Sequence, residues 1–322
     1  MTTYASAGVS LESATSLSSW LNPRVGGLFG GMVPASALKE YDHPVLVSSM
    51  DGIGTKVRLA RRLGRFEGLG QDVVHHCVND IAVHGAQPMF FLDYLAFHRL
   101  GEEIARRIVG SIADACASVG IALAGGETAE MPLVYREGEL DVAGAIVGVV
   151  EQSEIIDGSS VTAGDVVLGL PSSGAHTNGY SLIQAIFTDA DYERVMPGSG
   201  ISLGEMLLLP HRCYASDIQE LRGRVEVHGL AHITGGGIAG NLSRVIPDGL
   251  QAVIELPPWP TLFQRIHEHG IAREEMARVF NLGIGLVAVC RPNSSGLAGG
   301  EWQPIGYIRE SRSERRVELG LS

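Results

Sequence analysis

Three acidic residues stand beside glycines or at the end of an apolar segment, where a protein could bind a metal ion or a phosphate. Asp51 opens the sequence DGIGTK after an apolar run, Asp80 ends CVND, and Glu127 follows two glycines. Carboxylates that converge from separate elements form the hard-oxygen site that Mg²⁺ prefers, and Mg²⁺ often bridges nucleotide phosphates. Each acid could instead cap a helix or stabilise a turn. The shared setting of the three favours a metal site.

Glycine turns beside these acids could bring backbone N–H groups close to a phosphate, because glycine has no side chain in the way. The chain contains 42 glycines, which cluster between apolar runs. The turns in question contain Gly52, Gly54 and Thr55, and then Gly125 and Gly126. Lys56 could add a positive charge there, although an isolated lysine is more often solvated.

A polar stretch in the second half of the chain, SSGAHTNGYS, precedes an apolar helical segment. Its small and polar members are Ser173, Gly174, His176, Asn178 and Ser181. Backbone N–H groups at such a helix start can bind an anion, but the pattern fits an ordinary capped helix equally well.

A second such stretch, AHITGGG, places His232 beside Thr234 and the three glycines Gly235, Gly236 and Gly237. Histidine can transfer a proton near neutral pH, and a triple-glycine turn can fold around an oxyanion. A lone histidine is usually structural, and its contact with the glycine turn is what favours catalysis here. The sequence NLGIG at residues 281–285 is a third glycine turn.

The remaining histidines give a weaker signal for metal binding. His75, His76 and His84 lie on one helical segment, but we find no cysteine or acid that completes a ligand set at the right spacing. His211 and Cys213 are likewise interpreted as structural.

The elements that must position these residues can be read from hydrophobic periodicity. In the first half we expect helices at residues 71–82 and 102–119 and strands at residues 45–47, 89–96, 121–124 and 143–150. In the second half we expect a glycine turn followed by a helix at residues 174–187 and again at residues 235–245. We expect strands there at residues 166–170, 251–256, 285–289 and 306–309. A polar segment at residues 157–165 separates the halves, so we predict domains at 1–161 and 162–322. Irregular alternation of strands and helices indicates an α+β or mixed α/β fold.

Composition limits the classes of partner. The net charge of −12 argues against a broad nucleic-acid-binding surface, although local loops and metal ions could still attract a small anion. No apolar run approaches the roughly 20 residues of a membrane span, and the N-terminus lacks a signal-peptide pattern. The four cysteines are scattered without metal-ligand spacing, which predicts a reducing, cytoplasmic location.

Taken in order, the motifs resemble one family, aminoimidazole ribonucleotide synthetase, also called phosphoribosylformylglycinamidine cyclo-ligase. The matching stretches run from about residue 45 to 309: DGIGTKVRLA, GQDVVHHCVNDIAVHGAQPMFFLDYLA, GGETAEMP, DVAGAIVGVVEQSEIIDG, SSGAHTNGYSL, AHITGGGIAGNLSRVIP and FNLGIG. The resemblance implies a homodimer whose N-terminal sheets pair and hold ATP near their interface, with a C-terminal α/β domain that closes over the substrate. The implied reaction is the ATP-dependent closure of formylglycinamidine ribonucleotide to 5-aminoimidazole ribonucleotide, which releases ADP and phosphate.

Carried over residue by residue, the resemblance implies that Asp51, Asp80 and Glu127 organise Mg²⁺–ATP, with Lys56 and Asp72 beside them. On the substrate side it implies Asn178 and His232 as polar groups, with His232 as the acid or base. The loops at residues 173–181 and 235–237 would hold the substrate or its ribose phosphate.

Departures from the family pattern leave other functions open. The segment at residues 18–31 is shorter than usual and contains no lysine, so Arg24 is its only cation. Met50, Ala175 and Leu133 replace a small hydroxyl residue, a proline and a glycine. The alternatives are a paralogue that performs a related ATP-dependent activation or cyclisation in a specialised pathway, and a small-molecule kinase such as thiamine-monophosphate kinase. A non-catalytic nucleotide-binding protein is a further alternative, against which the intact acids and His232 argue.

Overall fold

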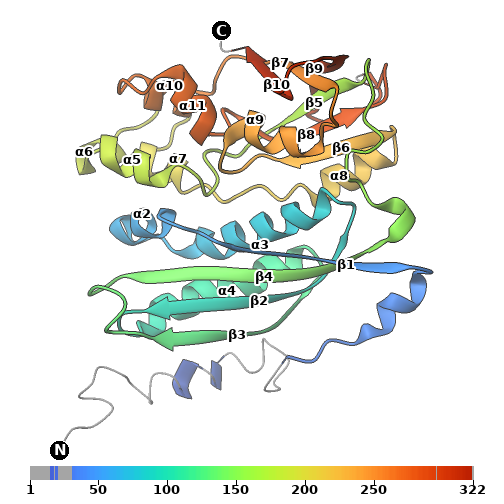
Figure 1. Cartoon of the computed structure of the whole chain (residues 1–322). Helices are drawn as coiled ribbons and strands as arrows, with labels where there is room; N and C mark the ends of the chain where they lie inside the picture. Colours follow the sequence, from blue (N-terminus) through green and yellow to red (C-terminus); the bar gives the residue numbers. More distant parts are fainter. Residues whose placement is uncertain (1–14, 18, 21–30, 295, 321–322) are drawn as a thin grey trace, which may run out of the picture. The chain divides into compact units, whose positions relative to one another are not determined.

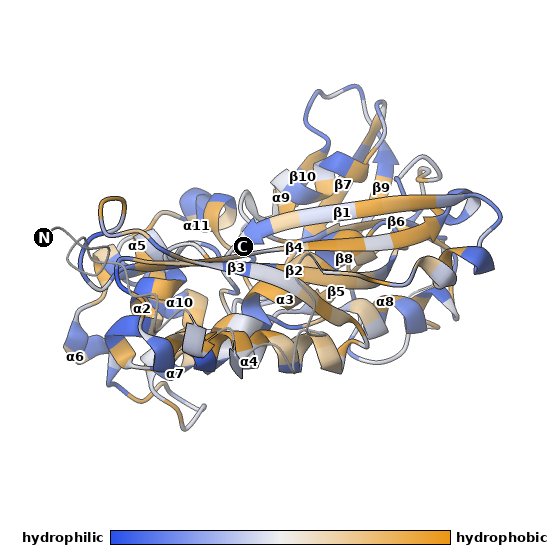
Figure 2. Cartoon of the chain, turned by 90° about the horizontal axis from the view of Figure 1, so that it is seen from below, coloured by the Kyte–Doolittle hydropathy of each residue, from blue (hydrophilic) through white to orange (hydrophobic). Residues whose placement is uncertain are grey.

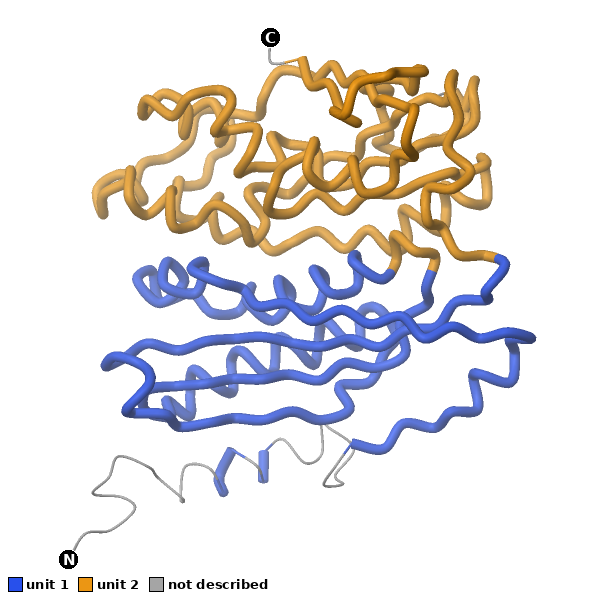
Figure 3. Tube along the Cα trace, in the orientation of Figure 1, with its two compact units in different colours: residues 1–81, 86–153 blue, residues 82–85, 154–322 orange. Residues whose placement is uncertain are grey.

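The computed structural model describes residues 15–17, 19–20, 31–294 and 296–320, and the chain divides into two compact units (Figures 1 and 3). Unit 1 comprises residues 1–81 and 86–153, and unit 2 comprises residues 82–85 and 154–322. From the sequence we expected the boundary between the two domains near Val161. Arg24 and most of the segment at residues 18–31 lie outside the described residues.

Unit 1 is built on a four-stranded sheet with the order β1-β4-β2-β3. The strands are β1 (Pro44–Gly52), β2 (Gln87–Phe97), β3 (Ala122–Glu130) and β4 (Leu140–Glu151). The strands β2 and β3 pair in parallel, whereas β4 pairs antiparallel with both β1 and β2. The four predicted strands are confirmed, and each is longer than its apolar run because backbone pairing continues past it. The predicted turn at Gly125 and Gly126 is wrong, since both residues lie inside β3.

Helices cover one face of this sheet. They are α2 (Lys56–Leu63), α3 (Glu67–Ala82) and α4 (Glu102–Ser118). Unit 1 also contains the short 3₁₀ helices η2 (Ala35–Glu40) and η3 (Gln152–Glu154). Helix α3 packs on β4, where the Cys77 Sγ donates to the carbonyl of Gly144 at 3.5 Å. A Cβ at Gly70 would lie 2.3 Å from the Ile112 backbone nitrogen, so only glycine lets α3 and α4 approach this closely. Both predicted helices are confirmed, and α3 begins four residues early.

The other face of the sheet of unit 1 carries exposed apolar side chains. Met50 of β1 and Leu92 of β2 both pair with Ala145 of β4, so the three side chains point to the same face. Met50 is 71% exposed, Leu92 is 39% exposed, and Leu46, four residues before Met50, is 61% exposed. Figure 2 shows the hydrophobic stretches of β1, β4 and β2. Met50 therefore belongs to a sheet face that carries several exposed apolar side chains.

Unit 2 is built on a six-stranded sheet with the order β10-β7-β9-β5-β8-β6. The strands are β5 (Val166–Pro171), β6 (Val227–His232), β7 (Leu250–Glu255), β8 (Ile284–Cys290), β9 (Gln303–Glu310) and β10 (Val317–Gly320). Among the described residues of unit 2, β10 and β7 pair in parallel and the other neighbouring strands pair antiparallel. The four predicted strands are confirmed to within a few residues. The sequence did not predict β10, nor β6, whose last residue is His232.

The sheet of unit 2 is buried on both faces. Val167 and Leu168 are neighbours on β5 but belong to separate apolar clusters, which also contain residues of α9 and of α8 respectively. The helices of unit 2 are α5 (Tyr180–Ile186), α6 (Asp189–Tyr192), α7 (Leu203–Leu207), α8 (Ala215–Arg222), α9 (Gly237–Leu242), α10 (Thr261–His267) and α11 (Arg273–Val279), with η4 (Ser243–Val245) after α9.

The sequence predicts a glycine turn followed by a helix over residues 174–187, and this is confirmed, with α5 beginning at Tyr180. Gly174 and Gly179 have positive φ angles of 153° and 79°, so the chain turns before α5 begins. The same pattern predicted at residues 235–245 is also confirmed, because α9 follows the first glycines and its last turn is the 3₁₀ helix η4. Among the described residues, no helix has the length and hydropathy needed to cross a membrane.

Candidate active site

In unit 1 the structure brings together Asp51, His76 and Asp80. Asp51 lies at the end of β1, while His76 and Asp80 are one turn apart on α3. The His76 Nε2 lies 2.9 Å from Asp51 Oδ2 and 3.8 Å from Asp80 Oδ2. The hydroxyl of Ser49 donates to Asp80 Oδ2 at 2.8 Å. Two carboxylates and one imidazole therefore form a small polar cluster at one end of the sheet.

The charges of this cluster stabilise one another. Burial alone would raise the pKa of Asp51, but the hydrogen bond from His76 and its positive charge bring that pKa below its ordinary value. Burial opposes a charge on His76, yet the hydrogen bond to Asp51 and the charges of Asp80 and Asp51 raise the pKa of His76. Asp51 and Asp80 remain 43% and 29% exposed at their side chains, so their oxygens are accessible to a cation.

Lys56 and Asp72 form a buried ion pair. Lys56 is the first residue of α2, Asp72 lies on α3, and Nζ lies 2.8 Å from Oδ1. Both side chains are 0% exposed. Burial lowers the pKa of Lys56, and the carboxylate of Asp72 opposes that change. The pair thus anchors α2 to α3, and the contact of Lys56 with a phosphate stays a prediction.

Glu127 lies away from Asp51 on the sheet. The row of paired residues runs from Asp51 through Gly144 and Asp93 to Gly126, so two strands separate Asp51 from Glu127. At about 4.8 Å per strand the backbones are about 14 Å apart. Within the described part of one chain, the three predicted metal ligands therefore do not converge.

Asp93, which the sequence did not single out, lies near Glu127. Burial raises the pKa of Asp93 to about 7, and the negative charge of Glu127 adds to this rise. A Cβ at Gly126 would lie 1.9 Å from Asp93 Oδ1, so this glycine makes room for the carboxyl group. Gly126, which the sequence suggested was part of a turn, therefore lies in strand β3 and leaves room for the buried carboxyl group of Asp93.

In unit 2, Asn281 ties the predicted loop at residues 172–181 to the third glycine turn. The Ser172 hydroxyl donates to Asn281 Oδ1 at 3.0 Å, and Asn281 Nδ2 donates to the Gly174 carbonyl at 2.9 Å. The backbone nitrogen of Gly283 donates to the same Oδ1 at 2.9 Å. These bonds fix the loop that carries Ser173, His176 and Asn178. Ser181 lies beyond it, exposed on α5.

The triple-glycine turn lies against this loop. A Cβ at Gly235 would be 3.2 Å from Asn178 Oδ1. The side-chain amide of Asn178, which the sequence predicts to bind the substrate, therefore lies next to the turn. Asn241 Nδ2 donates to the carbonyls of Gly237, Gly235 and Thr234 at 2.8, 3.3 and 3.3 Å. Gly236 and Gly237 have φ angles of 97° and 64°, a conformation that other residues rarely adopt. The side-chain amide of Asn241 therefore stabilises the conformation of this turn.

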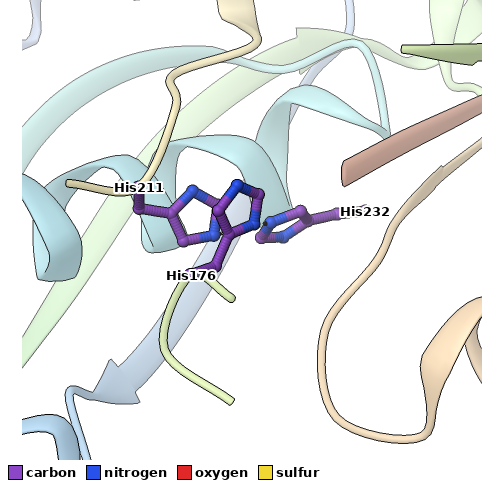
Figure 4. A group of neighbouring side chains, drawn as sticks. All are labelled: His176, His211 and His232. Carbon is purple, nitrogen blue, oxygen red and sulfur yellow. Dashed lines mark hydrogen bonds between the residues drawn. The ribbon is translucent and has the colours of Figure 1, made fainter. Parts of the chain in front are cut away.

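Three buried histidines gather beside these loops (Figure 4). The His176 and His211 rings stack with their centroids 3.7 Å apart, and His232 Nε2 lies 3.1 Å from His211 Nε2. One nitrogen from each ring lies within 4.8 Å of the others, a spacing that a transition-metal ion could use. The predicted residues His176, Asn178, His232 and Gly235 therefore do come together within unit 2.

Two interpretations of the sequence are corrected by these contacts. His76 does have an acid at ligand spacing, because Asp80 lies four residues further along the same helix. That i, i+4 spacing was visible in the sequence. His211 is also more than an isolated core histidine, but its contact with His232 joins residues 21 positions apart, and no local pattern predicts it.

Comparison with known proteins defines the class of fold. Residues 35–150 match the N-terminal domain of AIR synthase related proteins, and residues 162–317 match the C-terminal domain. Among solved structures, Escherichia coli HypE aligns with a TM-score of 0.71 at 20% identity, covering 96% of this chain and 93% of that one. Thiamine monophosphate kinase from Aquifex aeolicus aligns with a TM-score of 0.59 at 16% identity, covering 97% and 98%. At such identities the likeness concerns the fold alone.

Sequence relatives are much closer. Phosphoribosylformylglycinamidine cyclo-ligase from Desulfitobacterium hafniense (strain DSM 10664 / DCB-2) is 47% identical over 303 residues, which is 90% of this chain and 89% of that protein. The protein of the same description from Burkholderia pseudomallei (strain 668) is 44% identical over 328 residues, covering 96% and 93%. The chain belongs to the AIR synthase family, that is, to the phosphoribosylformylglycinamidine cyclo-ligases.

Proposed function

We propose that this protein catalyses the ATP-dependent closure of formylglycinamidine ribonucleotide to 5-aminoimidazole ribonucleotide, with release of ADP and phosphate, in purine biosynthesis. The observation that carries the proposal is the 47% identity to a cyclo-ligase across nine-tenths of the chain. The histidines, amide and glycine turns gathered in unit 2 supply groups that such a reaction needs.

Asp51 and Asp80 are the proposed ligands of the Mg²⁺ that accompanies ATP. Their oxygens are hard donors and partly exposed, which suits this cation, and His76 orients Asp51 through a hydrogen bond. Gly54 and Thr55 follow closely and would place backbone N–H groups near a phosphate, whereas the Gly52 N–H donates to Asp51 Oδ1 at 2.6 Å. When bound, Mg²⁺–ATP activates the formyl oxygen of the substrate as a phosphate ester. Glu127, two strands further away, stays a prediction as a third ligand.

His232 is the proposed acid–base residue. Ring closure requires that an amidine nitrogen lose a proton as it attacks the activated carbon, and a neutral imidazole can accept that proton. Asn178 beside Gly235 would hold the substrate by hydrogen bonds that its amide can donate and accept. The backbone N–H groups of the glycine turn and of the loop at residues 173–178 would bind the phosphates.

We further propose that the protein is a homodimer in which the apolar sheet faces of unit 1 meet. Leu46, Met50 and Leu92 support this, because large apolar side chains exposed together on one face commonly mark an interface. The scattered, unpaired cysteines agree with the cytoplasmic location expected from the sequence.

The test uses purified full-length protein with ATP, Mg²⁺ and formylglycinamidine ribonucleotide, and measures aminoimidazole ribonucleotide. We expect one ADP and one phosphate for each ring formed. A phosphorylated open-chain product would indicate a kinase instead, and ring closure only of another amide or amidine would indicate a paralogue with a different substrate. His232→Ala should lower kcat by roughly 100-fold or more and change the affinity for ATP little. Turnover like that of the wild type would remove His232 from the mechanism.

A further inference from the structure

We propose that Asn281 orients the peptide between Gly174 and Ala175 so that the backbone N–H of Ala175 donates a hydrogen bond to an anionic oxygen of the bound substrate. The inference rests on the proposed function and deepens it at the loop of residues 173–178. Its basis is the set of hydrogen bonds made by the Asn281 side chain, together with one buried backbone N–H that has no acceptor among the described residues.

The partners of Asn281 fix which way its amide group points. Its Oδ1 lies 2.9 Å from the backbone nitrogen of Gly283, and its Nδ2 lies 2.9 Å from the carbonyl oxygen of Gly174. A backbone N–H can only donate and a carbonyl can only accept, so turning the amide over would break both bonds. The hydroxyl of Ser172 is a second donor to Oδ1, at 3.0 Å. The Nδ2 group of Asn281 therefore holds the carbonyl of Gly174.

The turn that carries Asn281 contains a strained residue. Leu282 is buried and has a φ angle of 52°, and Gly283 after it has a φ angle of 98°. This conformation costs a leucine roughly 1–2 kcal/mol, and such strain persists only where surrounding bonds hold it. Asn281 provides two of these bonds, because its Oδ1 accepts from Gly283 and its own carbonyl accepts from the N–H of Ile284 at 3.0 Å. The backbone that carries the Asn281 side chain is therefore held in one conformation.

The carbonyl of Gly174 decides where the next N–H points. This carbonyl and the N–H of Ala175 belong to one peptide group, which is trans and places them on opposite sides. Because the carbonyl points to Asn281, the N–H of Ala175 points away from it. Gly174 has a φ angle of 153°, which glycine adopts far more readily than other residues. Gly174 and Asn281 together give this peptide its orientation.

The N–H of Ala175 is a buried donor, and no group among the described residues accepts a hydrogen bond from it. Ala175 is 3% exposed, and a buried donor without a partner costs roughly 1–3 kcal/mol. Such N–H groups are rare, and a ligand oxygen removes the cost, most strongly when the oxygen carries a charge. The carbonyl of Ala175 accepts from the backbone N–H of Asn178 at 3.3 Å, so this donor belongs to the same turn as the predicted substrate residue.

The donor distinguishes this chain from the family pattern, which has a proline at this position. Proline has no N–H, so the ring-closure chemistry of the family does not depend on this bond. We therefore expect the N–H of Ala175 to strengthen substrate binding and to leave the chemical step unchanged.

Substitution of Ala175 tests the donor. Ala175→Pro removes the N–H and restores the residue of the family pattern, whereas Ala175→Gly keeps the N–H and serves as the matched control. We expect Ala175→Pro to raise KM for formylglycinamidine ribonucleotide roughly tenfold or more, the usual effect of losing a hydrogen bond to a charged group, with kcat little changed. Ala175→Gly should raise KM much less. An Ala175→Pro enzyme whose KM equals that of Ala175→Gly would overturn the inference.

Asn281→Asp tests whether Asn281 acts through this peptide. The carboxylate keeps an oxygen that accepts from Gly283 and Ser172, but its second oxygen faces the carbonyl of Gly174 and repels it. We expect KM, measured at alkaline pH so that the new carboxyl is ionised, to rise about as much as in Ala175→Pro. The double variant should show little further rise, because the donor is already absent. Full additivity of the two substitutions would overturn the role of Asn281.

NMR of protein labelled with ¹⁵N-alanine gives a readout that does not depend on turnover. The Ala175 signal is assigned by its loss in Ala175→Gly. We expect its amide proton to shift downfield when formylglycinamidine ribonucleotide is added, and in the same direction with inorganic phosphate. A signal that neither probe moves would overturn the inference. A shift in a protein that forms no ring would instead keep the inference and refute the proposed function.

Discussion

The buried pair of Lys56 and Asp72 allows a quantitative test of what the lysine of the DGIGTK motif does. At 2.8 Å and 0% exposure, the attraction between the two charges is about 6 kcal/mol for an effective dielectric constant of 20. Desolvation offsets much of this, but removing one partner leaves the other charge buried. Lys56→Met should therefore lower the free energy of unfolding of unit 1 by about 3–5 kcal/mol.

The matched control is the double substitution Lys56→Met/Asp72→Leu, which removes both charges. Because a buried ion pair can often be replaced by apolar groups with little loss, we expect the double variant to be more stable than Lys56→Met alone. Urea unfolding can be followed at unit 1 through Trp20, after Trp259 and Trp302 of unit 2 are changed to phenylalanine.

Two results would refute this reasoning. One is a Lys56→Met protein within about 1 kcal/mol of the wild type, which is the range of an exposed ion pair. The other is a double variant that loses the sum of both single effects, since that would mean the two charges do not interact. If Lys56→Met instead raised KM for ATP with no loss of stability, the phosphate contact predicted from the sequence would replace the structural role.

Three further predictions test other parts of the account. Asp51→Asn should weaken Mg²⁺–ATP binding at least about tenfold in calorimetry, or about 1.4 kcal/mol, and unchanged binding would exclude this carboxylate as a ligand. Met50→Glu should place a charge on the apolar sheet face and shift the protein towards monomer in sedimentation, whereas a wild type already monomeric would contradict the dimer. The pKa of Asp93 is raised to about 7, so between about pH 4 and 7 the folded state holds a proton that the unfolded state has lost. The free energy of unfolding should therefore fall by up to roughly 4 kcal/mol as the pH rises from about 4 to 7, and change little above that. Asp93→Asn should abolish that slope, and a wild-type stability independent of pH in this window would show that the carboxyl is not held neutral.

Apolar periodicity was enough to predict most of the elements that position the site. It found the core strands of both sheets and helices α3 and α4, because burial requires the apolar spacing that the sequence shows. The ends were less predictable, since strands continue for as long as a neighbour offers backbone partners. The segment with Gly125 and Gly126 looked like a turn for this reason, although pairing with β2 keeps it in a strand.

The site was predictable where one segment carries its own chemistry. His232 and the glycines after it, or Asn178 within its loop, were identified from local composition and from the family motifs. The contact of His232 with His211 depends instead on how β6 and the chain before α8 pack in unit 2, which no local spacing encodes. His76 lies between these cases, because its pairing with Asp80 follows helical spacing but its bond to Asp51 needs the packing of α3 against the sheet.

The most direct test of the proposed chemistry follows the formyl oxygen of the substrate. If ATP activates that oxygen as a phosphate ester and the amidine nitrogen then displaces it, substrate labelled with ¹⁸O in the formyl group must deliver the label to inorganic phosphate. We predict one labelled oxygen in the phosphate for each molecule of aminoimidazole ribonucleotide formed, measured by mass spectrometry. Ring formation with unlabelled phosphate would contradict the proposed activation of the formyl oxygen.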